Sequence, residues 1–171
     1  MPLKLLSILA AVALVAACET APESDDSASG SGSSASSGSS SSVSSSSLQP
    51  GSQEDLVVNV GDRVFFGFDR FDLDQSSRAT LEKQAAWLKT YQNVVVTVEG
   101  HADERGTREY NLGLGERRAN SAKDYLVALG VSPDRIRTIS YGEERPVALG
   151  SNEDAWSQNR RAVTVVGGAG S

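Results

Sequence analysis

The 171-residue sequence has one cysteine and one histidine, which limits the chemistry that its side chains can support. A single cysteine cannot form a disulfide within the chain, and one histidine argues against a zinc or iron site built from Cys and His. Basic residues are also few, because 16 Lys and Arg stand against 22 Asp and Glu, for a formal net charge of -6. A nucleic-acid partner is therefore not expected, since phosphate binding depends on basic surfaces.

Apolar side chains are almost absent between Ser24 and Ser47. In this stretch 16 of the 24 residues are Ser and 3 are Gly. Such a composition cannot offset the entropy of ordering the chain, so we expect residues 18–52 to act as a flexible linker. Residues 53–167 remain for folding, enough for one domain with a single core, and residues 168–171 are expected to form a frayed tail.

The N-terminus carries the longest apolar run, over residues 5–17. At about 1.5 Å per residue this run falls short of the ~30 Å bilayer core, so residues 1–17 are predicted to be a signal peptide. Small residues precede Cys18, in a pattern that resembles a bacterial lipobox. The resemblance implies that Cys18 becomes the acylated first residue. Because the next residue is Glu19 and not Asp, it also implies sorting to the outer membrane. The alternative is an ordinary secreted protein with a cysteine near its cleavage site.

Strand and helix patterns alternate after residue 53. A nearly continuous run of Val is typical of a central strand, and Asp74 is a suitable N-cap for a helix in which Leu81, Ala85 and Leu88 form one stripe. This alternation predicts β-α-β crossovers and a partly parallel sheet packed by helices. The expected elements are a strand over 56–66, a helix over 74–91, a strand over 94–98, a helix over 108–129 closed by Gly130, and strands over 136–141 and 161–166.

Two unusual loops are expected at the carboxyl ends of strands, where ligands tend to bind in such sheets. They are residues 67–69 and 100–106. Beside them, the helix over 108–129 has one face that includes Leu114, Arg118 and Ala122. A guanidinium on a core-facing stripe is costly unless it is paired, and Asp103 is the natural neighbour.

Arg118 and Asp103 together predict a site with one fixed charge of each sign. Arginine binds a carboxylate through two parallel hydrogen bonds, and a carboxylate binds an ammonium group. The pair would therefore suit a zwitterionic ligand, such as the free end of a diamino acid. The alternatives are that the two residues form a structural ion pair, or that Asp103 only shapes a turn.

The chain contains a run of ordered motifs over residues 64–166, which are Phe66-Gly67-Phe68-Asp69, residues 96–107, Glu109-Tyr110-Asn111, residues 114–120, residues 140–146 and residues 159–163. Together these motifs resemble the OmpA-like peptidoglycan-binding domain family. The resemblance implies an α+β, two-layer βαβαβ sandwich with a mixed, four-stranded sheet, which binds the diaminopimelate-containing stem peptide of peptidoglycan without a covalent bond. By position, Asp103 would receive the ligand ammonium and Arg118 its carboxylate, Phe68 and Asp69 would line the pocket, and Leu114 would form an apolar wall.

The lipobox and polar linker also match the layout of lipid-anchored members of this family. The resemblance implies attachment at the periplasmic face of the outer membrane, with TolB and other Tol proteins as partners and a role in envelope integrity and division. Arg117, Asn120 and Lys123 would contribute to TolB docking, whereas the plainer interpretation of this face is a solvated surface. A related lipoprotein without Tol partners is the alternative.

The loop of His101, Asp103 and Glu104 could instead suggest catalysis, as in a cell-wall hydrolase. The sequence has no second histidine, and no motif places a nucleophile beside a base. We therefore expect a protein that is not an enzyme and that needs no cofactor or metal. His101 is predicted to form hydrogen bonds within its loop, and Trp156 is predicted to be a core residue.

Overall fold

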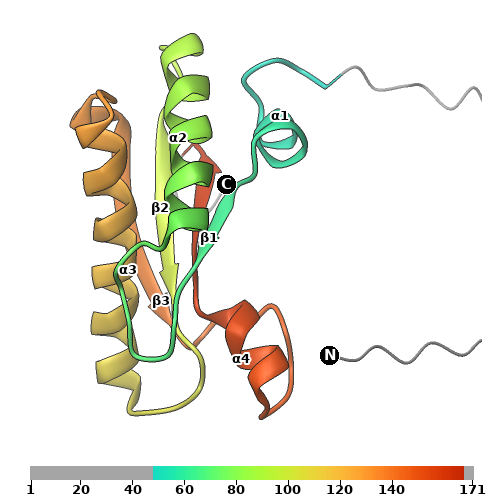
Figure 1. The fold of residues 1–171 in the computed structure, drawn as a ribbon, viewed down its shortest axis with the longest axis vertical. Coiled ribbons are helices and arrows are strands. Elements are labelled where there is room, and N and C mark those ends of the chain that lie inside the picture. The colour runs from blue at the N-terminus through green and yellow to red at the C-terminus, as the bar shows by residue number, and fades with distance from the viewer. Residues whose placement is uncertain (1–47, 168–171) are drawn as a thin grey trace, which may run out of the picture. The chain divides into compact units, whose positions relative to one another are not determined.

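The computed structural model describes residues 48–167, so the predicted signal peptide, Cys18, most of the linker and the tail lie outside the described residues. Its four strands form one mixed sheet in the order β1-β4-β2-β3 (Figure 1). β2 and β3 are parallel, whereas β4 is antiparallel to both of its neighbours. This arrangement confirms the predicted α+β fold with a partly parallel four-stranded sheet. The strands are β1 (Arg63–Phe65), β2 (Val96–His101), β3 (Ile136–Gly142) and β4 (Arg161–Val166).

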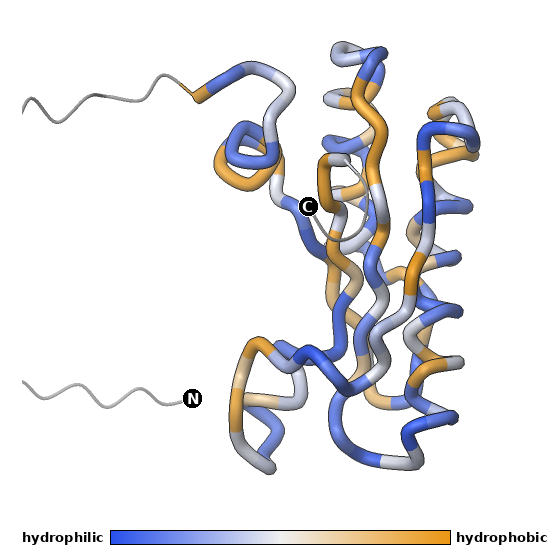
Figure 2. The backbone as a smooth tube through the Cα atoms, turned by 180° about the vertical axis from the view of Figure 1, so that it is seen from behind, coloured by the Kyte–Doolittle hydropathy of each residue, from blue (hydrophilic) through white to orange (hydrophobic). Residues whose placement is uncertain are grey.

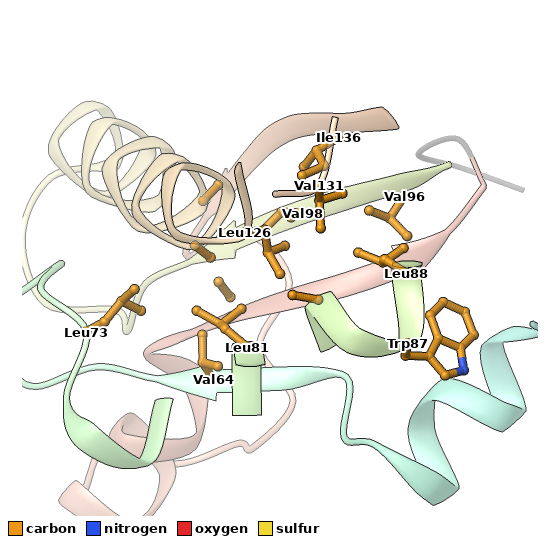
Figure 3. Close-up of a cluster of buried hydrophobic side chains, with 14 of the residues drawn as sticks. Val64, Leu73, Leu81, Trp87, Leu88, Val96, Val98, Leu126, Val131 and Ile136 are labelled. Carbon is orange, nitrogen blue, oxygen red and sulfur yellow. The ribbon is translucent and has the colours of Figure 1, made fainter. Parts of the chain in front are cut away.

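Two long helices, α2 (Gln75–Thr90) and α3 (Arg108–Ala128), pack on one face of this sheet (Figure 1). The hydrophobic core lies between the helices and the sheet (Figure 3). Leu88 of α2, Val98 of β2 and Leu126 of α3 are each fully buried there. Because burial of apolar surface is the main favourable term in folding, this layer stabilises the domain. Within residues 48–167, no helix is both long enough and apolar enough to cross a membrane.

The ends of the long helices are set by capping residues, of which Asp74 and Gly130 were expected from the sequence. Asp74 caps α2, because its side chain accepts a hydrogen bond of 2.7 Å from the backbone N–H of Ser77. Thr107 caps α3 in the same way, through the N–H of Tyr110. Gly130 follows the end of α3 with a φ of 93°, a left-handed conformation that glycine adopts without strain. Both predicted helices are thus confirmed, within one or two residues.

The predicted strand over 56–66 is wrong for most of its length. Its first part belongs to helix α1 (Gln53–Asn59), which is capped by Ser52. Asp55 holds this helix in place, since its carboxylate accepts hydrogen bonds from the Gly51 N–H and from Trp87 Nε1 of α2. The apolar run resembled a strand because it is rich in Val, but Leu56 is buried while Val58 is 65% exposed, as on a one-sided helix.

Two further elements have no counterpart in the sequence prediction, the 3-10 turn η1 (Pro133–Arg135) and helix α4 (Glu153–Asn159). α4 is only seven residues long, so it is too short to show a helical period. The expectation that Trp156 is a core residue is wrong, because this side chain is half-buried and lies outside the hydrophobic core. α4 instead brings Trp156 toward the loop that follows β2.

Candidate functional site

The loops after β1 and β2 lie at the same end of the sheet, because both strands are antiparallel to β4 and so run in the same direction (Figure 1). The loop that follows β2 and leads into α3 is largely hydrophilic (Figure 2). With the first turns of α3, the two loops enclose a pocket of about 180 Å³. All five residues predicted to bind the ligand line it together. Its lining is Phe68, Asp69, Asp103, Arg105, Gly106, Tyr110, Asn111, Leu114 and Arg118.

Two glycines set the distance between α3 and the sheet. A Cβ at Gly100 of β2 would overlap the carbonyl oxygen of Gly115, and a Cβ at Gly115 would overlap the Ser140 hydroxyl of β3. Only glycine allows this contact, so the helix lies directly on the strands. Arg118, three residues further along α3, is therefore brought under the two loops, and none of its surface is exposed.

The Arg118 guanidinium is held by backbone carbonyl groups from two separate segments. Its Nε donates to the Arg70 oxygen at 2.8 Å, its Nη1 to the His101 oxygen at 2.8 Å, and its Nη2 to the Gly67 oxygen at 3.1 Å. A guanidinium has five N–H groups, so two are left, one on each terminal nitrogen. Such a pair matches the two oxygens of a carboxylate.

The charge of Arg118 is kept despite its burial. Loss of solvent lowers its pKa to about 10, while the negative charge of nearby Asp103 acts in the opposite direction. The group is thus protonated at neutral pH. The structure does not contain the ion pair between Arg118 and Asp103 that was one alternative, since Asp103 is paired with Arg105 and Arg160 instead.

Asp103 is buried and is held by two arginines. Its Oδ2 lies 2.6 Å from Arg105 Nη2 and 3.3 Å from Arg160 Nη1, and its Oδ1 accepts from the Arg105 backbone N–H. Burial alone would raise the pKa of Asp103, but hydrogen bonds from Arg105 and Arg160 outweigh it and lower the pKa below its usual value. The pocket therefore contains a permanent carboxylate close to a permanent guanidinium.

Arg105 is a site residue that the sequence did not reveal. Its guanidinium lies between two aromatic rings, 4.1 Å from the ring centroid of Phe68 and 4.0 Å from that of Trp156. Cation–π contacts of this kind favour a fixed position over the pocket. The Trp156 indole also donates to Glu104 at 3.1 Å. The only available signal was that Arg105 follows Asp103 by two residues, because Trp156 comes from α4, about fifty residues away.

Phe68 and Asp69 form the side of the pocket nearest β1. Phe68 is 59% exposed, so it is not a core aromatic. Asp69 has a φ of 55°, a left-handed conformation that Asp tolerates better than most residues. Its Oδ1 accepts a hydrogen bond from the Tyr110 hydroxyl, which raises the pKa of Tyr110. This bond joins the first loop to α3 across the pocket.

The three residues considered for partner docking lie on the outer side of α3. Arg117 is exposed, with its guanidinium 5.6 Å from the Phe71 ring centroid and 5.7 Å from that of Tyr110. Asn120 and Lys123 are only partly exposed, although helical periodicity predicted full exposure. Arg117 is thus the member of this set that borders the pocket, through Tyr110.

His101 does not form the hydrogen bonds that were expected of it. Its ring is buried, and neither ring nitrogen has a hydrogen-bond partner. The ring stacks on Tyr141 with 5.6 Å between centroids, and burial, together with the charges of Arg161 and Arg145, lowers its pKa to about 3. His101 is therefore a neutral packing residue at neutral pH. In residues 48–167, no group of three His, Cys, Asp or Glu side chains is arranged to hold a metal ion.

Comparison with known proteins agrees with this architecture. The model of the OmpA family matches residues 65–160. The peptidoglycan-associated lipoprotein of Rhizobium meliloti is 62% identical over 122 residues, which cover 71% of this chain and 69% of the relative. The protein of the same name from Agrobacterium fabrum is 58% identical over 124 residues, which cover 72% and 70% of the two chains.

Solved structures show the same fold. The crystal structure of the peptidoglycan-associated lipoprotein from Burkholderia pseudomallei has a TM-score of 0.61 and 40% identity, and the match covers 62% of this chain and 90% of that one. The C-terminal domain of Helicobacter pylori MotB has a TM-score of 0.58 over 64% of this chain and 86% of its own. Its identity is 21%, so this second likeness concerns the fold alone.

Proposed function

Because this chain belongs to the OmpA family, and is 62% identical to a peptidoglycan-associated lipoprotein, we propose that it binds peptidoglycan non-covalently through the pocket described above. One observation carries this proposal. Arg118 and Asp103 line one small pocket but do not pair with each other, and Arg118 keeps two N–H groups beyond those used by backbone carbonyls. A ligand with a negative and a positive group could bind Arg118 with the first and Asp103 with the second.

The ligand chemistry that fits is the free end of diaminopimelate in a stem peptide. Its carboxylate would accept two hydrogen bonds from Arg118, and its ammonium would approach the Asp103 carboxylate beside Arg105. The methylene groups of the ligand would lie against Leu114 and Phe68, which supply the apolar part of the pocket. Each part of this ligand thus has a counterpart of matching chemistry.

Net charge supports recognition by a local pocket rather than by bulk attraction. Residues 53–171 contain 15 basic and 18 acidic side chains, and the cell wall is itself anionic. Long-range electrostatics therefore does not favour the encounter. Affinity must come from a few charges in fixed positions, and the burial of Asp103 and Arg118 strengthens their interactions with a ligand.

The pocket is suited to binding rather than to proton transfer. Asp103 has a pKa below its usual range, and His101 is neutral and buried, so neither is poised to act as an acid at neutral pH. We accordingly propose a tether and not a hydrolase. Acylation of Cys18 would anchor the chain at the periplasmic face of the outer membrane, and residues 18–52 would let the domain reach the wall.

We further propose that the chain takes part in the Tol-Pal system. The surface around Arg117 is suited to docking a protein such as TolB, because two exposed aromatic side chains, Phe71 and Tyr110, lie beside an exposed cation. Aromatic and Arg residues are enriched in the energetic centres of interfaces. Such a partnership would connect wall binding with outer-membrane constriction during division.

Calorimetric titration of the purified full-length chain tests the pocket. A stem peptide with diaminopimelate at its third position should bind at least about tenfold more tightly than the same peptide with lysine, because lysine lacks the carboxylate for Arg118. Asp103→Asn should weaken binding roughly 30- to 5,000-fold, while Asp124→Asn, an exposed carboxylate elsewhere on α3, should have no effect.

Circular dichroism of each variant separates lost binding from lost folding, and the comparison of the two peptides needs no variant at all. Equal affinity for both peptides, or unchanged binding by folded Asp103→Asn, would contradict the assignment of the pocket. Release of soluble wall fragments by the unmodified chain would support the hydrolase instead.

A further inference from the structure

A second and larger hollow lies on the other side of the loop that follows β1. It has a volume of about 720 Å³, within the range of ligand sites. One wall comes from the end of β1 and the segment after it, and the opposite wall comes from α4. Its lining includes Phe65, Gly67, Arg70, Asp72, Ser157 and Gln158.

The two hollows share residues 67–70 as a common wall. Gly67 and Arg70 line the larger groove, whereas Phe68 and Asp69, between them in the sequence, line the pocket. Arg118 fixes this wall from the pocket side, since it donates to the carbonyl oxygens of Gly67 and Arg70. A ligand held in the pocket is thus separated from the groove by a single backbone segment.

The chemistry of the groove favours an uncharged polar ligand with apolar faces. Phe65 is 46% exposed and presents a flat ring. Arg70 and Asp72 neutralise each other through two parallel bonds of 2.7 and 2.8 Å, and their remaining lone pairs and N–H groups can bind hydroxyl groups. Gln158 donates its amide N–H to the backbone oxygen of Asp154, which leaves the amide oxygen as an acceptor.

We propose that this groove binds the amino-sugar backbone to which the stem peptide is attached. The inference rests on the proposed function, because the peptide must first occupy the pocket. Only two residues separate diaminopimelate from the sugar, a span of roughly 10 Å, so the sugar must lie just outside the pocket. The groove is the larger hollow beside the pocket. The ring of Phe65, the hydroxyl of Ser157 and the amide of Gln158 match the hydroxyl and N-acetyl groups of such a sugar.

Titration with two ligands tests this inference. The full-length chain is titrated with the free tripeptide, and with the same tripeptide attached to its disaccharide. Several added hydrogen bonds and an aromatic contact should make the disaccharide form bind about tenfold more tightly. Phe65→Ala and Gln158→Ala should each reduce this ratio toward one, and should leave the affinity for the free tripeptide within about twofold of the unmodified chain.

Phe71→Ala is the matched control, since Phe71 is also 46% exposed but does not line the groove. It should leave the tenfold ratio intact. Equal binding of the two ligands by the unmodified chain would overturn the groove while leaving the pocket in place, and so would a ratio that survives both Phe65→Ala and Gln158→Ala. Failure of both ligands to bind would overturn the pocket itself, and this inference with it.

Discussion

Arg117 and Arg118 are consecutive residues of α3, but they lie in opposite environments. Arg118 is fully buried and donates three hydrogen bonds to backbone carbonyls, whereas Arg117 is exposed and lies near two aromatic rings. The helical step of about 100° per residue separates them. The same side chain can thus be a fixed part of a binding pocket or an adaptable part of a surface, and its neighbours in the fold decide which.

The largest difference between the two arginines should appear in stability. Arg118→Ala should lower the free energy of unfolding by about 4 kcal/mol, because it leaves three carbonyls without a donor in a buried site. Arg117→Ala should change it by less than about 0.5 kcal/mol. Urea denaturation followed by circular dichroism measures both values, and equal losses would remove the distinction between the two residues.

Only part of the pocket could be predicted from local rules. The helical stripe that contains Arg118, and Asp103 as its neighbour, followed from spacing along the chain, whereas the pocket roles of Phe68, Asp69 and Leu114 were implied by the family resemblance. Strand direction then brings such loops to one end of the sheet. The structure accordingly places these residues around one pocket.

The features that the sequence did not predict depend on contacts between distant segments. The carbonyl groups that hold Arg118 belong to the backbone, and no side-chain pattern identifies them. The contact of Arg105 with Trp156 needs α4, a helix too short to be recognised. Helix α1 differs from the predicted strand because the tertiary contact of Asp55 with Trp87, together with its local bond from the Gly51 N–H, outweighs the β propensity of the Val residues.

A smaller effect on stability than that of Arg118→Ala should come from a change in pH, because His101 is, like Arg118, a buried titratable side chain. Its folded pKa of about 3 lies below the ordinary value of 6.5, so the unfolded chain takes up a proton that the folded chain does not. This contribution to stability is fully present above pH 6.5 and is lost as the pH falls toward 3. By about pH 5 the loss should be about 2 kcal/mol.

His101→Phe should remove this dependence, because the ring that stacks on Tyr141 can no longer be protonated. The measurement is the free energy of unfolding at pH 7 and at pH 5, with urea, for both chains. Carboxylates with lowered pKa values, such as Asp103, lose their contribution only at lower pH. An identical difference between the two pH values in both chains would show that His101 is not the responsible group.

The smallest effect on stability, and the clearest on partner binding, should come from charge reversal at the exposed arginine. Arg117→Glu should leave the free energy of unfolding within about 0.5 kcal/mol but abolish capture of TolB in a pull-down. Lys89→Glu, an exposed reversal on α2, is the control and should retain TolB. Capture by Arg117→Glu would exclude Arg117 from the docking surface.

The attachment of helix α1 has a mechanical consequence. The described chain enters the domain at α1, at the opposite end of the sheet from the loops of the pocket (Figure 1). With the proposed membrane anchor and wall ligand both in place, tension between them would act along the strands, so that they resist it in shear. The force would reach β4 through the Gln53 side chain, which donates to the Thr164 oxygen and accepts from the Val166 N–H. It would reach α2 through the hydrogen bond from Trp87 to Asp55. These few bonds at α1 would be the first to carry the load when the two layers of the envelope are pulled apart.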